Sequence, residues 1–69
     1  MMRDRFGNLI EIGDFVAGGA SIYQIENIHL YAKDAAAAVN IHNKELVSLS
    51  LKFVEKITPE EAMFAILKR

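Results

Sequence analysis

Hydrophobic and polar residues alternate along several short stretches of the chain, which predicts β-structure over most of its length. In residues 46–53 every second residue is apolar, and we expect one strand whose core-facing side chains are Val47, Leu49, Leu51 and Phe53. Glycines interrupt every window before residue 20, so no helix of useful length is expected in the first part of the chain. The pattern therefore favours a mainly β fold.

The longest β-prone stretch, residues 21–32, changes phase in its middle. Tyr23 and Ile25 share one parity. Ile28 and Leu30 share the other. A regular strand cannot turn both pairs to the same side, because its side chains alternate strictly between two faces. We therefore predict one bent strand with a β-bulge where the phase changes.

Shorter strands are predicted at 9–12 and 15–17, each next to turn-forming residues. Residues 36–42 leave two interpretations open. Their alanines favour a helix by intrinsic propensity, whereas the alternation after them favours a strand. We favour the strand, because the segment is short for a stable helix.

The end of the chain has the sequence of a helix start. Thr58 is placed to cap the helix, Pro59 suits its first position, and Glu61 completes a capping box. One arc of this helix carries large apolar side chains, namely Met63, Phe64, Ile66 and Leu67. A helix this short needs a docking surface. The arc covers the sheet or, through Phe64 and Leu67, forms an interface between copies of the chain.

The opening residues 4–16 have the pattern D-x-x-G-N-x-I-x-x-G-D-x-V. This pattern resembles the first strands of small SH3-like barrels, and residues 54–57 resemble the closing strand. The resemblance implies a small SH3-like antiparallel barrel of about five strands over 4–57, and the predicted C-terminal α-helix over 58–69 is an addition to that barrel. The length of 69 residues is that of a single domain. Similar proteins are common in bacteriophages and other mobile elements, so the resemblance also implies a phage-type origin. It transfers no catalytic or binding residue.

Composition and charge narrow the classes of function. The 69 residues are 52% hydrophobic and 25% charged, as in globular domains, and the net charge of −1 excludes a generally cationic nucleic-acid binder. A local basic patch stays possible. The chain has no cysteine, so it has no disulfide framework and no thiolate metal site. We see neither a membrane span nor a signal peptide, and we predict a cytoplasmic protein, in the host cytoplasm if it is phage-encoded.

Few side chains could act in catalysis or bind a cofactor, and we predict no enzyme and no cofactor. The glycine pair at 18–19 lacks the lysine and the spacing of a phosphate-binding loop. A metal ion held by His29, His42 and Glu45 is the one metal site we considered, and no metal-ligand spacing supports it.

Strand alternation suggests one shared polar surface. If the β-branched and leucine residues of three neighbouring strands point inward, their neighbours point outward together. This candidate binding face consists of Asn27, His29, Tyr31, Asn40, His42, Ser48, Ser50 and Lys52. We expect a non-catalytic interaction module that binds a protein partner, in a host or viral complex, and forms a homo-oligomer. A nucleic-acid-binding barrel, disfavoured by the net charge, and a nucleotide-binding oligomer are the alternatives.

Overall fold

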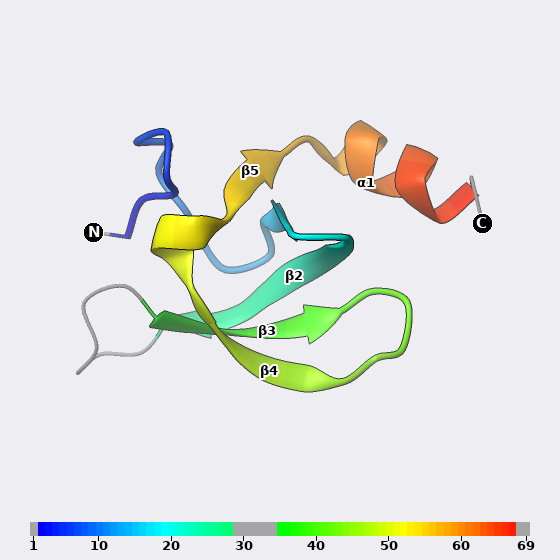
Figure 1. The fold of residues 1–69 in the computed structure, drawn as a ribbon, viewed down its shortest axis with the longest axis horizontal. Helices are drawn as coiled ribbons and strands as arrows, with labels where there is room; N and C mark the ends of the chain where they lie inside the picture. Colours follow the sequence, from blue (N-terminus) through cyan, green and yellow to red (C-terminus); the bar gives the residue numbers. More distant parts are fainter. Residues whose placement is uncertain (1, 29–34, 68–69) are drawn as a thin grey trace.

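The computed structural model describes residues 2–28 and 35–67. Five antiparallel strands form one sheet in the order β4-β3-β2-β1-β5, and a helix follows the last strand (Figure 1). This confirms the predicted fold class, although the described sheet is open, with β4 and β5 at opposite edges. The elements are β1 (Phe15–Gly18), β2 (Ser21–Ile28), β3 (Ala35–Asn40), β4 (Leu46–Ser50), the 3₁₀ helix η1 (Leu51–Phe53), β5 (Glu55–Ile57) and α1 (Pro59–Leu67).

The hydrophobic core lies on one face of this sheet, which we call the core face. Strands β1, β2 and β3 contribute small and branched side chains to it, while the N-terminal segment and the region of η1 close it from the other side. Its buried members, each at most 2% exposed, are Ile10, Val16, Ile25, Ala36, Ala38, Leu51 and Val54. In strands β1, β2 and β3 the side chains that alternate with these core residues point to the opposite face of the sheet, which we call the outer face.

Glycines shape the hairpin between β1 and β2. The two strands pair as far as Gly18 and Ser21, which leaves a two-residue loop. Gly19 has a φ of +60°, which suits the first central position of such a loop. A side chain at Gly18 would be tight, because a Cβ there would lie 3.0 Å from Cγ1 of Val54, which would have to shift. Gly19 therefore allows the tight turn, and Gly18 allows close packing against Val54.

The predicted bend in the long strand is confirmed. In β2 the pairing with β3 runs Ile25 to Ala38 and then Asn27 to Ala37, so one residue is inserted between them. The insertion lets Ile25 and Ile28 pack on the same core, Ile25 fully and Ile28 in part. The remainder of the predicted strand, residues 29–32, lies outside the described residues.

The predicted strand over 36–42 is confirmed as far as Asn40, since β3 is Ala35–Asn40 and residues 41–42 belong to the following turn, but the phase of the strand differs from the prediction. Ala36 and Ala38 face the core, and Val39 belongs to the outer face. The register explains this, because Ala36 pairs with Leu49 and residue 38 pairs with Val47, and paired residues share a face. The core is thin at β3, so Ala36 and Ala38 fill positions where a larger residue was expected.

The predicted strand at 9–12 is wrong. In this region Leu9 makes an isolated bridge with Arg3, and Ile12 is 64% exposed. The chain turns here because the Glu11 N–H donates to the carboxylate of Asp14, while the Asp14 N–H donates back to the Glu11 carbonyl. Ile12 therefore sits on a turn and is exposed, although in a regular strand it would share the buried face of Ile10.

Phe53 was predicted to face the core, and this too is wrong, because Phe53 is 74% exposed. Strand β4 ends at Ser50, and the next three residues form η1. In a 3₁₀ helix residues three apart lie on the same side, so Leu51 and Val54 share the buried side. Side chains therefore no longer alternate between the two faces of the sheet after Ser50.

Asp4 fastens the N-terminal segment to β5. Its side chain is only 6% exposed, and its carboxylate accepts hydrogen bonds from the N–H groups of Phe6, Asn8 and Lys56 and from the Asn8 side chain, at 2.7–3.0 Å. Burial by itself raises the pKa of this carboxyl. The hydrogen bonds, with that of Lys56 first, outweigh burial and lower the pKa from 3.8 to about 2. Asp4 is therefore a charged anchor of the fold.

The predicted capping box at the start of α1 is confirmed. The Glu61 N–H donates to Oγ1 of Thr58 at 3.1 Å, and the Thr58 N–H donates to Oε1 of Glu61 at 3.0 Å. Ala62 is the buried residue of the described helix. The helix thus has a well-defined start, and it approaches the rest of the chain with a small side chain.

Candidate functional site

The candidate binding face predicted from the sequence does not form one surface. Asn27 pairs with Ala37, which pairs with Ser48, so these residues share the outer face of the sheet. Ser50 continues that face beside Ala35, and Lys52 lies beyond the strand on η1, where it is exposed. His29 and Tyr31 lie outside the described residues.

Asn40 points the other way from this group and is 8% exposed. Its side-chain oxygen accepts hydrogen bonds from the N–H of His42 at 2.8 Å and of Asn43 at 3.3 Å. These bonds fix the turn at residues 41–45, in the manner of an Asx turn. The predicted outward position of Asn40 is therefore wrong, because its amide is committed to the turn between β3 and β4.

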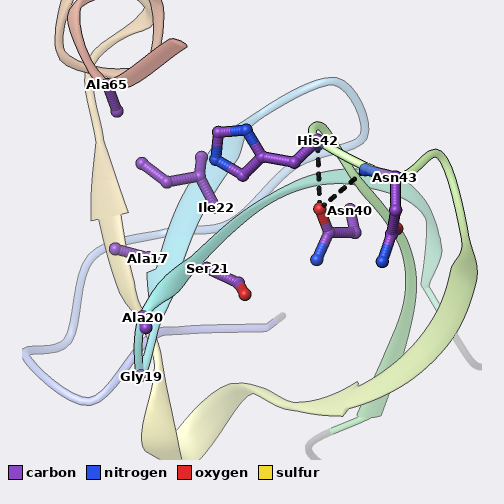
Figure 2. A pocket seen from close by; sticks show the side chains of 9 residues that line it. All are labelled: Ala17, Gly19, Ala20, Ser21, Ile22, Asn40, His42, Asn43 and Ala65. Atoms are coloured by element: carbon purple, nitrogen blue, oxygen red, sulfur yellow. Dashed lines mark hydrogen bonds between the residues drawn. The ribbon is translucent and has the colours of Figure 1, made fainter. Parts of the chain in front are cut away.

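A groove that the sequence did not indicate lies between three parts of the chain (Figure 2). The hairpin of β1 and β2 forms one side, the turn after β3 forms another, and Ala65 points into it from α1. The groove has a volume of about 560 Å³ and is open to solvent. Its lining consists of Ala17, Gly19, Ala20, Ser21, Ile22, Asn40, His42, Asn43 and Ala65.

The groove is apolar on its helix side and polar on its turn side. Ala17, Ile22 and Ala65 supply hydrocarbon, and the ring of His42 lies across the groove from Ala65 (Figure 2). No lysine or arginine of the described ranges is among the lining residues. The volume suits a small ligand or a protein side chain, but the lining offers no fixed positive charge to a phosphate group.

Next to this groove, α1 presents the large apolar side chains of the predicted arc to solvent. We call this set the α1 surface. Its members are Met63 (63% exposed), Phe64 (62%), Ile66 (47%) and Leu67 (77%). The arc therefore does not cover the sheet, which was one of the two expectations for it. The candidate interface residues Phe64 and Leu67 are both accessible.

The groove was missed because its walls are small residues. Alanine carries no pattern that separates a wall from a buried position, and Ala17, Ala20 and Ala65 each sit inside segments interpreted as strand, turn or helix. The available signal was the alternation of small and large apolar residues along 62–67. It marks a helix with a close-packing side and a bulky side.

Comparison of the chain with protein-family models, with curated proteins and with solved structures finds no match. Helices in the described ranges 2–28 and 35–67 fall short of the length and apolarity needed to cross a bilayer. In the same ranges no three or more histidine, aspartate or glutamate side chains gather as the ligands of a metal ion would.

Proposed function

We propose that this protein is a small non-catalytic interaction module that binds a protein partner through the α1 surface. The observation that carries the proposal is the exposure of four large apolar side chains on one nine-residue helix. Large apolar side chains have on the order of 150–200 Å² of accessible surface, so at these exposed fractions the four together present roughly 400 Å². Patches of this size on a small domain mark sites of association.

The local construction of α1 supports this assignment. The capping box and the acidic first turn stabilise the helix without help from its large side chains. Its contact with the chain uses Ala62 and Ala65, which keep the helix close. The bulky side chains are thus held in a defined helical arrangement, and Met63, Ile66 and Leu67 are exposed as helix-mediated recognition requires.

Site-specific photo-crosslinking tests the proposal. A benzophenone amino acid at position 67 is expected to form protein adducts in an extract of cells that produce this protein, either with other chains or with copies of itself. The matched control carries the same group at Leu46, which is 67% exposed on β4. Adducts from position 67 and not from position 46 support the proposal. Equal labelling from both positions, or none from position 67, contradicts it.

A further inference from the structure

We infer that residues 3–8, which we call the N-terminal tip, form a second binding surface whose ligand is single-stranded nucleic acid. The N-terminal segment lies towards one end of the long axis of the molecule, and the end of α1 lies towards the other (Figure 1). The inference goes beyond the proposed function and does not depend on it. The observation that carries it is an arginine stacked on an exposed aromatic ring in a firmly held turn.

Hydrogen bonds hold the backbone of the N-terminal tip in one conformation. The Asp4 N–H donates to the carbonyl of Asn8 at 2.9 Å. The buried carboxylate of Asp4 accepts the N–H groups of Phe6 and Asn8. The Arg5 N–H donates to the carbonyl of Val54 at 3.1 Å, which ties the tip to the region of η1. The tip is therefore pre-organised, and a ligand would bind it without the cost of ordering a loop.

The side chains that the tip presents to solvent are cationic and aromatic. The guanidinium group of Arg5 lies over the ring of Phe6, 4.7 Å from its centroid, and Phe6 is 62% exposed. Arg3 is also exposed, and its Nη1 donates to the carbonyl of Gly7 at 2.7 Å. These three side chains are not members of the hydrophobic core, so their arrangement does not serve the packing of the chain.

A second exposed ring belongs to the segment bonded to the tip. Phe53 is 74% exposed and directly precedes Val54, whose carbonyl accepts the Arg5 N–H. In Figure 1 the N-terminal segment and η1, which carries Phe53, lie at the same end of the molecule. Exposed aromatic rings combined with cations are the elements on which single strands stack.

The outward charge of the tip suits a phosphate backbone, although the whole chain has a net charge of −1. Asp4 is the acidic residue of the tip, and its carboxylate is buried and accepts four hydrogen bonds. The charges that face solvent there are therefore those of Arg3 and Arg5. Glu55 follows close after Phe53 in the sequence, but it pairs with Ala17, which lines the groove, so it lies on the groove side of the sheet.

A single strand matches this surface better than other anionic ligands do. Guanidinium groups pair with phosphates, and both the guanidinium plane and the aromatic rings stack on unpaired bases. An acidic peptide would use the cations and leave the rings exposed, whereas in a duplex the faces of the bases are covered by neighbouring base pairs. With two cations the affinity is modest, and we expect a Kd on the order of 10–100 µM at low salt.

The first experiment measures binding of a fluorescent oligothymidine of about 12 nucleotides to the purified chain by anisotropy. For two phosphate contacts the slope of log K against log salt concentration is expected to be about −1.4, and for Arg5→Gln about −0.7. Lys44→Gln, at an exposed lysine in the turn between β3 and β4, is expected to keep the wild-type slope and affinity. Equal losses in the two variants, or no binding by the wild type at low salt, overturn the inference.

A second experiment tests the stacking. Phe6→Leu keeps an apolar side chain but removes the flat ring, and it is expected to weaken binding about 5- to 150-fold. Leu46→Ala, at a comparably exposed position on β4, is expected to bind as the wild type does. The chain has no tryptophan, so Phe6→Trp introduces a single indole, whose emission is expected to be quenched when bases stack on it. Leu46→Trp is expected to show no quenching, and circular dichroism confirms that all variants are folded.

Polyglutamate and the α1 surface supply the remaining outcomes. If polyglutamate displaces the oligonucleotide at equal charge and Phe6→Leu binds as the wild type does, the tip is an anion site without base stacking, and the inference is overturned. Leu67→Glu is expected to leave oligonucleotide binding unchanged, and a loss there would place the strand on α1, which also overturns it. Because crosslinking from position 67 is a separate measurement, this inference and the proposed function can fail independently.

Discussion

Two segments lie beside the sheet, a cover on its core face and the helix α1 next to the groove, and they differ in what they contribute. On the core face, the N-terminal segment and the region of η1 insert Ile10, Leu51 and Val54, each at most 2% exposed. At the groove, Ala65 of α1 is one of the lining residues, together with Ala17 of β1 and Ile22 of β2. The core-face cover completes a core within the chain, while α1 keeps its large side chains outside.

Polar groups show the same contrast. The core-face cover includes Asp4, a buried carboxylate whose oxygens are engaged by four hydrogen bonds within the chain. The polar residues around the groove, such as His42 and Asn43, lie at an opening to solvent. The core-face cover therefore serves folding, and association through the α1 side is what we propose. Changes in the two regions should therefore separate loss of stability from loss of assembly.

The largest effect is expected from Leu51→Ala on the core-face side. Leu51 is fully buried, so its truncation should lower the free energy of unfolding by about 2–5 kcal/mol, a large part of the stability of a small domain. The same substitution at Phe53, two residues on and 74% exposed, should change it by about 0.5 kcal/mol or less. Denaturant titration of both variants decides, and a similar loss at the two positions would contradict the assignment of η1.

A somewhat smaller effect is expected from Asp4→Ala. The change leaves the N–H groups of Phe6, Asn8 and Lys56 without their acceptor, at an expected loss of about 2–3 kcal/mol in the free energy of unfolding. Thermal or urea denaturation at neutral pH measures this loss. Crosslinking from position 67 at matched folded concentration should not change, because the hydrogen bonds of Asp4 join the N-terminal segment to β5 and not to α1.

The charge of Asp4 adds a pH dependence. Its pKa is lowered in the folded chain to about 2, so its contribution is complete above pH 4 and is lost as the pH falls towards 2. The stability difference between the wild type and Asp4→Asn should therefore shrink over that interval. A difference that stays constant from pH 5 to about pH 2 would show that the charged form is not what the hydrogen bonds stabilise.

The smallest effect is expected from Thr58→Ala, which removes the acceptor for the Glu61 N–H. The loss should be about 1 kcal/mol, and Thr58→Ser should retain most of it, since serine also caps. Because the cap fixes the helix that carries the α1 surface, the same variant should also reduce crosslinking from position 67. If binding is unchanged although the helix is less stable, the α1 surface does not depend on the cap, which contradicts this prediction.

Local sequence rules predicted much of this fold. The bulge in β2 followed from the phase change between Tyr23 and Ile28, and the helix start followed from Thr58 and Glu61. Both depend on residues close together in the sequence. The turn at Ile12 and the exposure of Phe53 were missed, because each depends on a backbone change that interrupts an apparently regular alternation.

The candidate site was harder to predict than the fold. Which of two parities in β3 faces the core is fixed by pairing with β4, and the sequence of β3 alone suggested the larger Val39 in place of Ala38. That error carried Asn40 to the wrong face. The groove is assembled from segments far apart in the chain, and methyl-sized side chains such as Ala17 and Ala65 give no local sign of it.

The bond between Asp4 and Lys56 also has a consequence for unwanted association. Strand β5 lies at one edge of the sheet, and the outward N–H of Lys56 already donates to the carboxylate of Asp4 at 2.7 Å. A foreign strand approaching this edge would meet a negative charge and an occupied donor. Natural proteins block exposed sheet edges by such means against cross-β stacking. The hydrogen bond that closes the fold at neutral pH thus also guards this edge, and protonation of Asp4 in strong acid would open both at once.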